Sequence, residues 1–205
     1  MTLSLNRRSG NSNGQIHWLT VPVNSKGAFD LPINKIAIAD SAWARKHWTS
    51  LKHAYAKAPF FARYAPLLED LYQQAGALAL LTEINELLLC ALCRELEIPT
   101  PFVRSDVIPR AADNPTGRLV EICLAREAAA YVSGPAAKGY IETGRFKAAG
   151  IDLLYANYAG YPVYDQAMTP FDHGVSFLDV LLRCGPEART HLKSLRDRAS
   201  FLDPA

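Results

Sequence analysis

Apolar residues recur along the chain with two different spacings, which indicates that strands and helices both occur. The segment at residues 16–23 is apolar on both faces, a pattern typical of a buried strand, and residues 33–39 and 151–156 are further strand candidates. A longer segment, residues 82–97, places apolar side chains every three or four positions and is followed by Pro99. This spacing predicts an amphipathic helix that ends before the proline.

Capping and helix-breaking residues predict further helices. Asp40 or Ser41 can begin one of them, and Pro66 suits the first turn of another, expected over residues 67–75. A short helix is expected at residues 145–149. Because predicted strands and helices alternate, we assign the chain to the α/β class, as a single domain whose helices pack on a mixed or mostly parallel sheet.

Two serine or threonine positions are assigned to helix starts. Thr116 is expected to cap one helix. Ser176 and Asp179 could be taken for catalytic residues, but their spacing is that of a capping box, and we assign them to helix capping.

Length and charge narrow the classes of function. The 205 residues suit one domain, predicted over residues 15–205, with residues 1–14 as a flexible arm or loop. A formal net charge of +2 without a clustered basic face argues against a nucleic-acid partner. The chain has neither the apolar core of a secretory signal nor an apolar segment long enough to span a membrane, so we expect a cytoplasmic protein.

The cysteines do not predict a metal site. Cys90 and Cys93 form a C-x-x-C motif inside a helical pattern, and no second pair or suitably spaced histidine completes a zinc site. We interpret them as packing residues and expect no metal.

The segment at residues 131–140 is the main candidate for ligand binding. A predicted strand stops at Ser133 and Gly134, and Lys138 and Tyr140 follow closely. Ligands of α/β proteins collect where strands end, and a turn of small residues with a nearby lysine suits an anion. The alternative is an ordinary turn in which glycine only supplies unusual backbone angles.

Polar residues also interrupt apolar segments elsewhere. Arg104, Ser105 and Asp106 lie in the middle of a predicted strand at residues 102–108, so they are expected at a strand end or facing a cleft. His47, one turn after a tryptophan, is a candidate general base because imidazole titrates near neutral pH. The alternative, which we favour, is an amphipathic residue at the rim of the core.

A long aromatic connection, residues 158–173, is a candidate binding loop. Tyr164, Gln166 and His173 offer the ring faces and hydrogen bonds that hold sugars or nucleotides. The alternative is a loop packed by its own aromatic side chains.

Several short motifs follow one another in an order that resembles a known family. They are residues 18–23, Trp43 with Lys46 and His47, residues 55–60, residues 81–85, residues 105–106, residues 131–134 with Tyr140, residues 150–151, residues 162–166, Phe171 and residues 176–185. Over roughly residues 6–192 the chain resembles the WbqC-like family. Each motif is short, and their collinear order makes the resemblance specific.

The resemblance implies a function that the residues alone do not. Family members are bacterial and often accompany genes for surface-polysaccharide (O-antigen) synthesis, and some are described as glycine transferases that acylate an amino sugar. It therefore implies a transferase acting on an amino sugar or nucleotide-sugar, with ATP or another activated donor. Our hypothetical roles are a base for His47 or Asp106, phosphate or oxyanion binding for Ser133, Gly134 and Lys138, and sugar binding for Tyr164 and Gln166.

The chain departs from the family at its beginning. Members usually open with a segment that forms a first strand and helix, and this sequence starts after that point. If that segment carries part of the site, the alternative is a non-catalytic ligand-binding or assembly protein. A missing strand would also leave a sheet edge that a partner chain could cover, giving a homo-oligomer.

Overall fold

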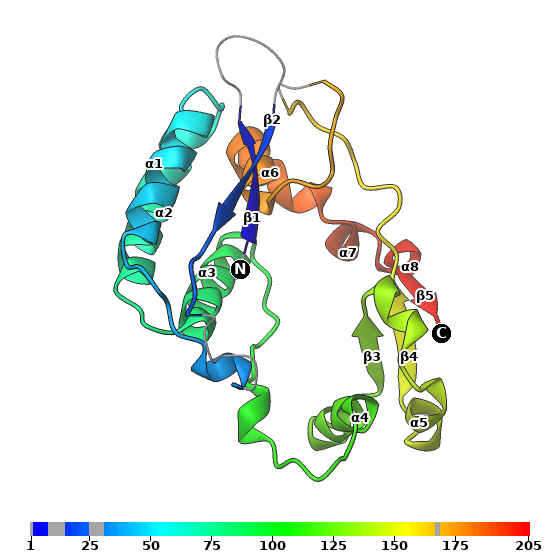
Figure 1. Cartoon of the computed structure of the whole chain (residues 1–205). Coiled ribbons are helices and arrows are strands. Elements are labelled where there is room, and N and C mark those ends of the chain that lie inside the picture. Colours follow the sequence, from blue (N-terminus) through cyan, green and yellow to red (C-terminus); the bar gives the residue numbers. More distant parts are fainter. Residues whose placement is uncertain (1, 8–14, 25–30, 167–168) are drawn as a thin grey trace. The chain divides into compact units, whose positions relative to one another are not determined.

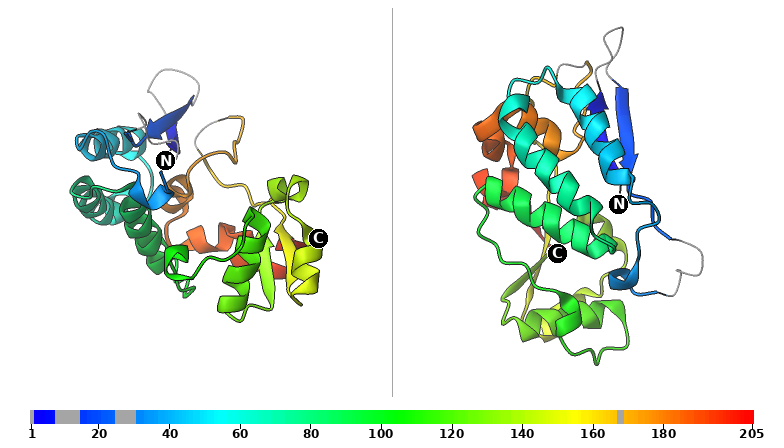
Figure 2. Two further views of the ribbon diagram at one scale, coloured as in Figure 1. Left: turned by 60° about the horizontal axis from the view of Figure 1, so that its bottom comes forward. Right: turned by 90° about the vertical axis from the view of Figure 1, so that its left-hand side faces the viewer.

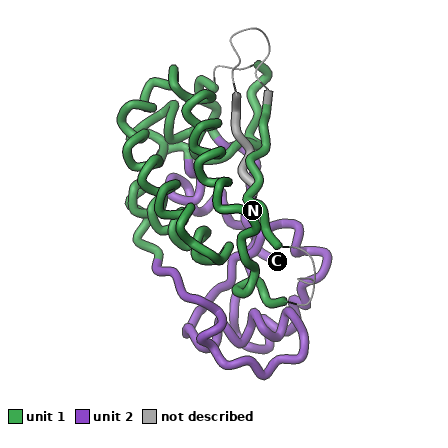
Figure 3. The backbone as a smooth tube through the Cα atoms, turned by 60° about the vertical axis from the view of Figure 1, so that its left-hand side comes forward, with its two compact units in different colours: residues 1–100, 162–191 green, residues 101–161, 192–205 purple. Residues whose placement is uncertain are grey.

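The computed structural model describes residues 2–7, 15–24, 31–166 and 169–205. The chain forms two compact units, each built from two separate segments (Figure 3). Unit 1 consists of residues 1–100 and 162–191, and unit 2 of residues 101–161 and 192–205.

Unit 1 combines a β-hairpin with a group of helices (Figure 1). Its elements are β1 (Thr2–Arg7), β2 (Gln15–Thr20), η1 (Ile33–Lys35), α1 (Trp43–Tyr55), α2 (Phe61–Gly76), α3 (Leu81–Glu95), α6 (Phe177–Cys184) and η4 (Gly185–His191), where η marks a 3-10 helix. β1 and β2 pair antiparallel, with Thr2 opposite Thr20 and Arg7 opposite Gln15. Part of the segment predicted as an arm is therefore a strand, while residues 8–14 lie outside the described residues.

The helices of unit 1 enclose its core. α1 packs against α2 and β1, and α2 packs against α3 and α6 (Figure 2). The largest fully buried side chains include Trp43, Leu51 and Tyr55 of α1 and Ile84 of α3. The predicted helix at residues 82–97 is confirmed as α3.

Two predictions of local structure in unit 1 are wrong. α2 begins at Phe61, so Pro66 lies inside the helix rather than in its first turn. Tyr64 and Leu68 on either side of the proline are buried, and their packing outweighs the lost backbone hydrogen bond. The predicted strand at residues 33–39 forms η1 and two isolated bridges, because its partners at Val23 and Leu80 each pair with a single residue.

Unit 2 is built around a small mixed sheet. Its elements are η2 (Ser105–Val107), α4 (Pro115–Ala125), β3 (Ala130–Ser133), η3 (Pro135–Gly139), α5 (Thr143–Ala148), β4 (Asp152–Ala156), α7 (Lys193–Arg196), α8 (Arg198–Phe201) and β5 (Leu202–Pro204). β3 and β4 are parallel, and β5 pairs antiparallel with β4. The core joins Cys123 of α4, Ala137 of η3, Phe146 of α5 and Tyr155 of β4.

The predicted class, α/β with a mixed sheet and packed helices, is confirmed. Two details in unit 2 differ from prediction. Asn114 caps α4, its side chain accepting a hydrogen bond from the Gly117 N–H, and Thr116 lies inside the helix. Residues 102–108, predicted as a strand, contain the 3-10 helix η2 instead. No helix among the described residues is long and apolar enough to cross a membrane.

Candidate functional site

The parallel pair β3–β4 presents its carboxyl edge at Ser133 and Ala156, where the two strands end. Gly134 follows β3 directly, and Tyr158 comes two residues after β4. Carboxyl ends of neighbouring parallel strands are the usual position of ligands in α/β proteins. We call Ser133, Gly134 and Lys138 the carboxyl-edge site.

Gly134 has a backbone conformation that other residues adopt easily, with φ −73° and ψ 153°. Pro135 follows it and favours this extended region for any residue. Among the described residues other than its two chain neighbours, the atom nearest to a β-carbon built on Gly134 is the Tyr158 hydroxyl, at 3.9 Å. Neither backbone angle nor crowding therefore requires a glycine here, and the alternative that glycine supplies an unusual turn is not supported.

Ser133 and Lys138 lie on the same side of the sheet. Ser133 is in register with Tyr155, and residues paired on parallel strands point to the same face. The Lys138 ammonium lies 4.9 Å from the centre of the Tyr155 ring, a cation–π contact. Among the described residues, neither the Ser133 hydroxyl nor the Lys138 ammonium has a hydrogen-bond or carboxylate partner. Tyr140, also a predicted binding residue, is 72% exposed.

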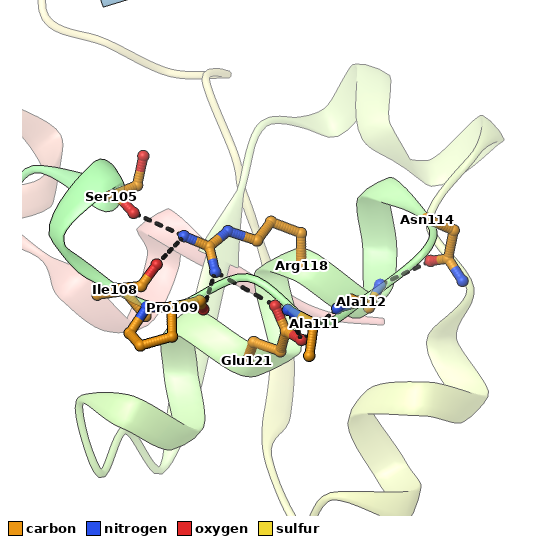
Figure 4. Close-up of polar contacts among 9 residues, drawn as sticks. Ser105, Ile108, Pro109, Ala111, Ala112, Asn114, Arg118 and Glu121 are labelled. Carbon is orange, nitrogen blue, oxygen red and sulfur yellow. Dashed lines mark hydrogen bonds and ion pairs between the residues drawn. The ribbon is translucent and has the colours of Figure 1, made fainter.

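Arg118 of α4 holds the segment that contains Arg104, Ser105 and Asp106 (Figure 4). Its guanidinium donates to the carbonyls of Ser105 at 2.6 Å and Ile108 at 2.8 Å. It also donates to the Pro109 carbonyl at 2.6 Å. These are carbonyls that a strand would offer to a neighbouring strand, which explains why the predicted strand at residues 102–108 does not form.

Glu121 completes this arrangement. Its carboxylate accepts hydrogen bonds from the Ala111 and Ala112 N–H groups and pairs with Arg118 at 3.2 Å. Arg104 and Asp106 form an exposed ion pair at 3.1 Å. Asp106, predicted as a base, therefore lies on an anchored surface segment with a cation beside it.

Tyr164 and Gln166 contact each other in unit 1, where their hydrogen bonds hold together the loop that contains them. The Gln166 amide donates to the Asp172 carbonyl at 2.7 Å and accepts from the Asp172 N–H at 2.9 Å. It also donates to the Tyr164 hydroxyl at 3.2 Å. Gln166 is only 2% exposed, and the His173 ring packs on Phe171 at 4.7 Å. These contacts favour the alternative of a loop packed by its own side chains.

Asp179 is fully buried and serves this same cluster. It accepts a hydrogen bond from the Tyr164 hydroxyl at 2.8 Å and pairs with Arg183 at 3.3 Å. Burial, with the nearby Asp179 charge, raises the pKa of the Tyr164 phenol. Ser176 caps α6 as predicted, its hydroxyl accepting from the Leu178 N–H, but the capping role predicted for Asp179 is wrong, because its carboxylate bonds Tyr164 and Arg183 instead. Sequence reasoning missed the buried ion pair, although the four-residue spacing of Asp179 and Arg183 on a helix could have suggested it.

His47 lies in the core of unit 1 and is 4% exposed. Its Nε2 is 3.1 Å from the Thr20 carbonyl, and its ring packs edge-on against Trp43. Burial lowers the pKa of its imidazole from the usual value of about 6.5. This placement favours the core interpretation over a catalytic base, and the catalytic role stays a prediction.

Cys90 and Cys93 are free thiols on α3. No group of three or more potential metal ligands occurs among the described residues. Tyr158 is the first residue of the connection predicted as a binding loop, residues 158–173, but it was not among the residues predicted to bind ligand. The predicted end of the strand at residue 156 was a signal that could have selected it.

Comparison with known proteins establishes the family. Residues 5–191 match the model of the WbqC-like protein family. The chain is 36% identical over 193 residues, 93% of its length, to "Uncharacterized protein Rv1507c" of Mycobacterium tuberculosis (strain ATCC 25618 / H37Rv), of which the match covers 82%. No solved structure matches the chain. The chain therefore belongs to the WbqC-like family, which confirms the resemblance seen in its motifs.

Proposed function

We propose that this protein is a transferase that acts on an amino sugar or nucleotide-sugar, by glycyl or acyl transfer, in cytoplasmic steps of surface-polysaccharide synthesis. The phosphate-bearing part of the ligand binds at the carboxyl-edge site. The observation that carries this proposal is the open space above Gly134, a glycine that the backbone does not require. A ligand that approaches the backbone closely would account for the missing side chain.

The chemistry of the neighbouring groups supports an anion. Ser133 supplies a hydroxyl and Lys138 an ammonium, and both lack a partner among the described residues. Hydrogen bonds from such groups to phosphate oxygens are charge-assisted and therefore strong. In the reaction, the sugar amine would attack the acyl carbon of a donor that has been activated by ATP or in another way. The activating group would then leave, and a base would take the proton from the amine.

One observation favours a second candidate, a non-catalytic ligand-binding or assembly protein. The carboxyl-edge site offers a hydroxyl and an ammonium, whereas His47, one of the two predicted bases, lies in the core of unit 1, where burial lowers the pKa of its imidazole. A protein of this kind would bind the same ligand without transferring a group.

A thermal-shift screen with nucleotides, nucleotide-sugars and glycine plus ATP tests ligand binding. Ligands that bind the folded state raise the melting temperature by mass action. We expect one nucleotide-containing class to raise it, and Gly134→Ala to abolish this shift. Gly134→Ala itself should keep or raise stability by about 0.4–1 kcal/mol, because alanine restricts the unfolded chain. Gly139→Ala, which also has open space around it, is the matched control and should keep the shift.

The outcomes separate the candidates. A ligand shift that survives in Gly134→Ala would remove the carboxyl-edge site from the proposal. No shift with any compound would argue against the ligand class and favour the assembly protein. With a ligand identified, mass spectrometry of the acceptor after incubation with activated donor distinguishes the transferase, which adds an acyl group, from the binder, which does not.

A further inference from the structure

Tyr158 is placed to contact whatever occupies the space above Gly134. Among the described residues outside the immediate chain neighbours of Gly134, the Tyr158 hydroxyl is the one atom within 4 Å of a β-carbon built on Gly134, at 3.9 Å. The side chain is 59% exposed, and its hydroxyl has no hydrogen-bond partner among the described residues. A phenol in this position can donate to a ligand oxygen.

Lys193 of α7 fixes the backbone on both sides of Tyr158. Its ammonium donates to the Asn157 carbonyl at 3.3 Å and to the Ala159 carbonyl at 2.9 Å. Lys193 is only 7% exposed, and no carboxylate within the described part of unit 2 forms an ion pair with it. Burying an ammonium is costly unless its N–H groups are bonded, so this lysine holds those two carbonyls firmly.

The rest of the Tyr158 environment belongs to the same C-terminal segment. The Tyr158 ring packs against Phe201 of α8, with ring centres 6.2 Å apart. The Asn157 amide donates to the Asp203 carboxylate of β5 at 3.3 Å. Residues 192–205 therefore determine where the Tyr158 hydroxyl lies relative to the end of β3.

We propose that Tyr158 is a ligand-binding residue of the carboxyl-edge site, donating its hydroxyl to a phosphate oxygen of the ligand, and that Lys193 is its positioning residue. This inference rests on the proposed function, and it adds a contact from the segment that follows β4, beside the end of β3 that sequence analysis selected. Lys193 acts through the backbone of residues 157–159, because its bonds go to the two carbonyls that flank Tyr158.

Two probes test the binding role in the full chain: inorganic pyrophosphate, which carries only the anion, and UDP-N-acetylglucosamine, a nucleotide-sugar. Calorimetric titration should show that Tyr158→Phe weakens binding of both probes about tenfold, the effect of losing one hydrogen bond to a charged group. Its melting temperature should stay that of the wild type, since the hydroxyl has no partner in the described protein. Tyr131→Phe, whose ring stacks on Phe146 in the core of unit 2, is the matched control and should bind as the wild type does.

A double-mutant cycle tests the positioning role. Lys193→Met should weaken binding about as much as Tyr158→Phe, and the double variant should be no weaker than Lys193→Met alone, because both changes remove the same contact. Independent, multiplying losses would overturn the positioning role. Wild-type affinity in Tyr158→Phe would overturn the ligand contact while leaving the proposed function intact.

A measurement without ligand tests the positioning role of Lys193 independently of the proposed function. In amide NMR spectra, Lys193→Met should shift the resonances of residues 157–159 and Gly134 more than the exposed-site control Lys147→Met does. Equal shifts would contradict the positioning role. If the wild type binds neither probe, the proposed anion site fails and the binding role of Tyr158 fails with it, whereas the NMR comparison still decides the role of Lys193.

Discussion

His47 shows how one buried residue couples stability to pH. Its ring is enclosed in unit 1, and burial lowers the pKa of the folded imidazole below its usual value of about 6.5. Between the two pKa values the unfolded chain binds more protons than the folded one, so lowering the pH favours unfolding. The stability that His47 supplies is therefore complete above about pH 6.5 and decreases as the pH falls toward the folded pKa.

We expect the free energy of unfolding to fall when the pH is lowered from about 7.5 to about 5, and this fall to be smaller in His47→Gln. Urea denaturation at a series of pH values measures it. His53→Gln, at an exposed histidine on the same helix, is the control and should keep the wild-type pH dependence. An unchanged pH dependence in His47→Gln would show that other groups dominate this window.

Two glycines show what residue-level reasoning can and cannot predict. Gly185 has φ +59°, and a β-carbon there would collide with the Phe60 ring, so the fold requires a glycine. Gly134 has an ordinary φ and open space, so the fold does not. The sequence presents both simply as glycines beside prolines. The difference depends on backbone angles and on neighbours distant in sequence, which composition and spacing do not reveal.

At the scale of elements, the sequence pattern predicted helices well where the residues of the helix itself determine its position. α3 follows its apolar spacing, and Ser176 caps α6 through its own side chain. The prediction of secondary structure failed where a side chain distant in sequence determines the backbone conformation. Residues 102–108 have an apolar, strand-like pattern, yet Arg118 takes their carbonyls and η2 forms instead. The sequence of residues 102–108 does not indicate that an arginine on α4 binds their carbonyls.

The same contacts predict the effect of removing Arg118. Without its guanidinium, three carbonyls of residues 105–109 lose their donor, and the segment should open more often. We expect trypsin to cleave Arg118→Ala after Arg110 about tenfold faster than wild type under native conditions, in the regime where opening limits cleavage. Arg118→Lys should be intermediate, because a single ammonium cannot reproduce the fork of the guanidinium.

The control for this experiment is Arg126→Ala, which removes an exposed arginine just after the same helix. It should be cleaved after Arg110 at the wild-type rate. Equal cleavage of Arg118→Ala and wild type would mean that residues 105–112 are held by other contacts.

At the scale of the whole molecule, the class and the family could be predicted from sequence, whereas the division into units could not. Collinear motifs spread over most of the chain identify the family, and the alternation of elements identifies the class. The units are discontinuous, however, and the second segment of unit 2, residues 192–205, contains only short elements. β5 has three residues and α7 four, too few for any periodicity to be recognised. The carboxyl-edge site depends on this segment, because Lys193 supports Tyr158 from it.

Unit 2 should therefore need both of its segments to fold. Residues 101–161 alone would keep β3 and β4 but lose the β5 pairing, the two Lys193 hydrogen bonds and the Tyr158–Phe201 contact. We expect this fragment to give poorly dispersed NMR spectra, and a version that joins residues 192–205 to it through a flexible linker to give well-dispersed ones. Placing Lys193→Met in the linked version should reduce its stability without abolishing the fold, because the β4–β5 pairing remains. If residues 101–161 folded equally well alone, the C-terminal return would be an addition to a complete unit, and the position of Tyr158 would be set by residues 101–161 themselves.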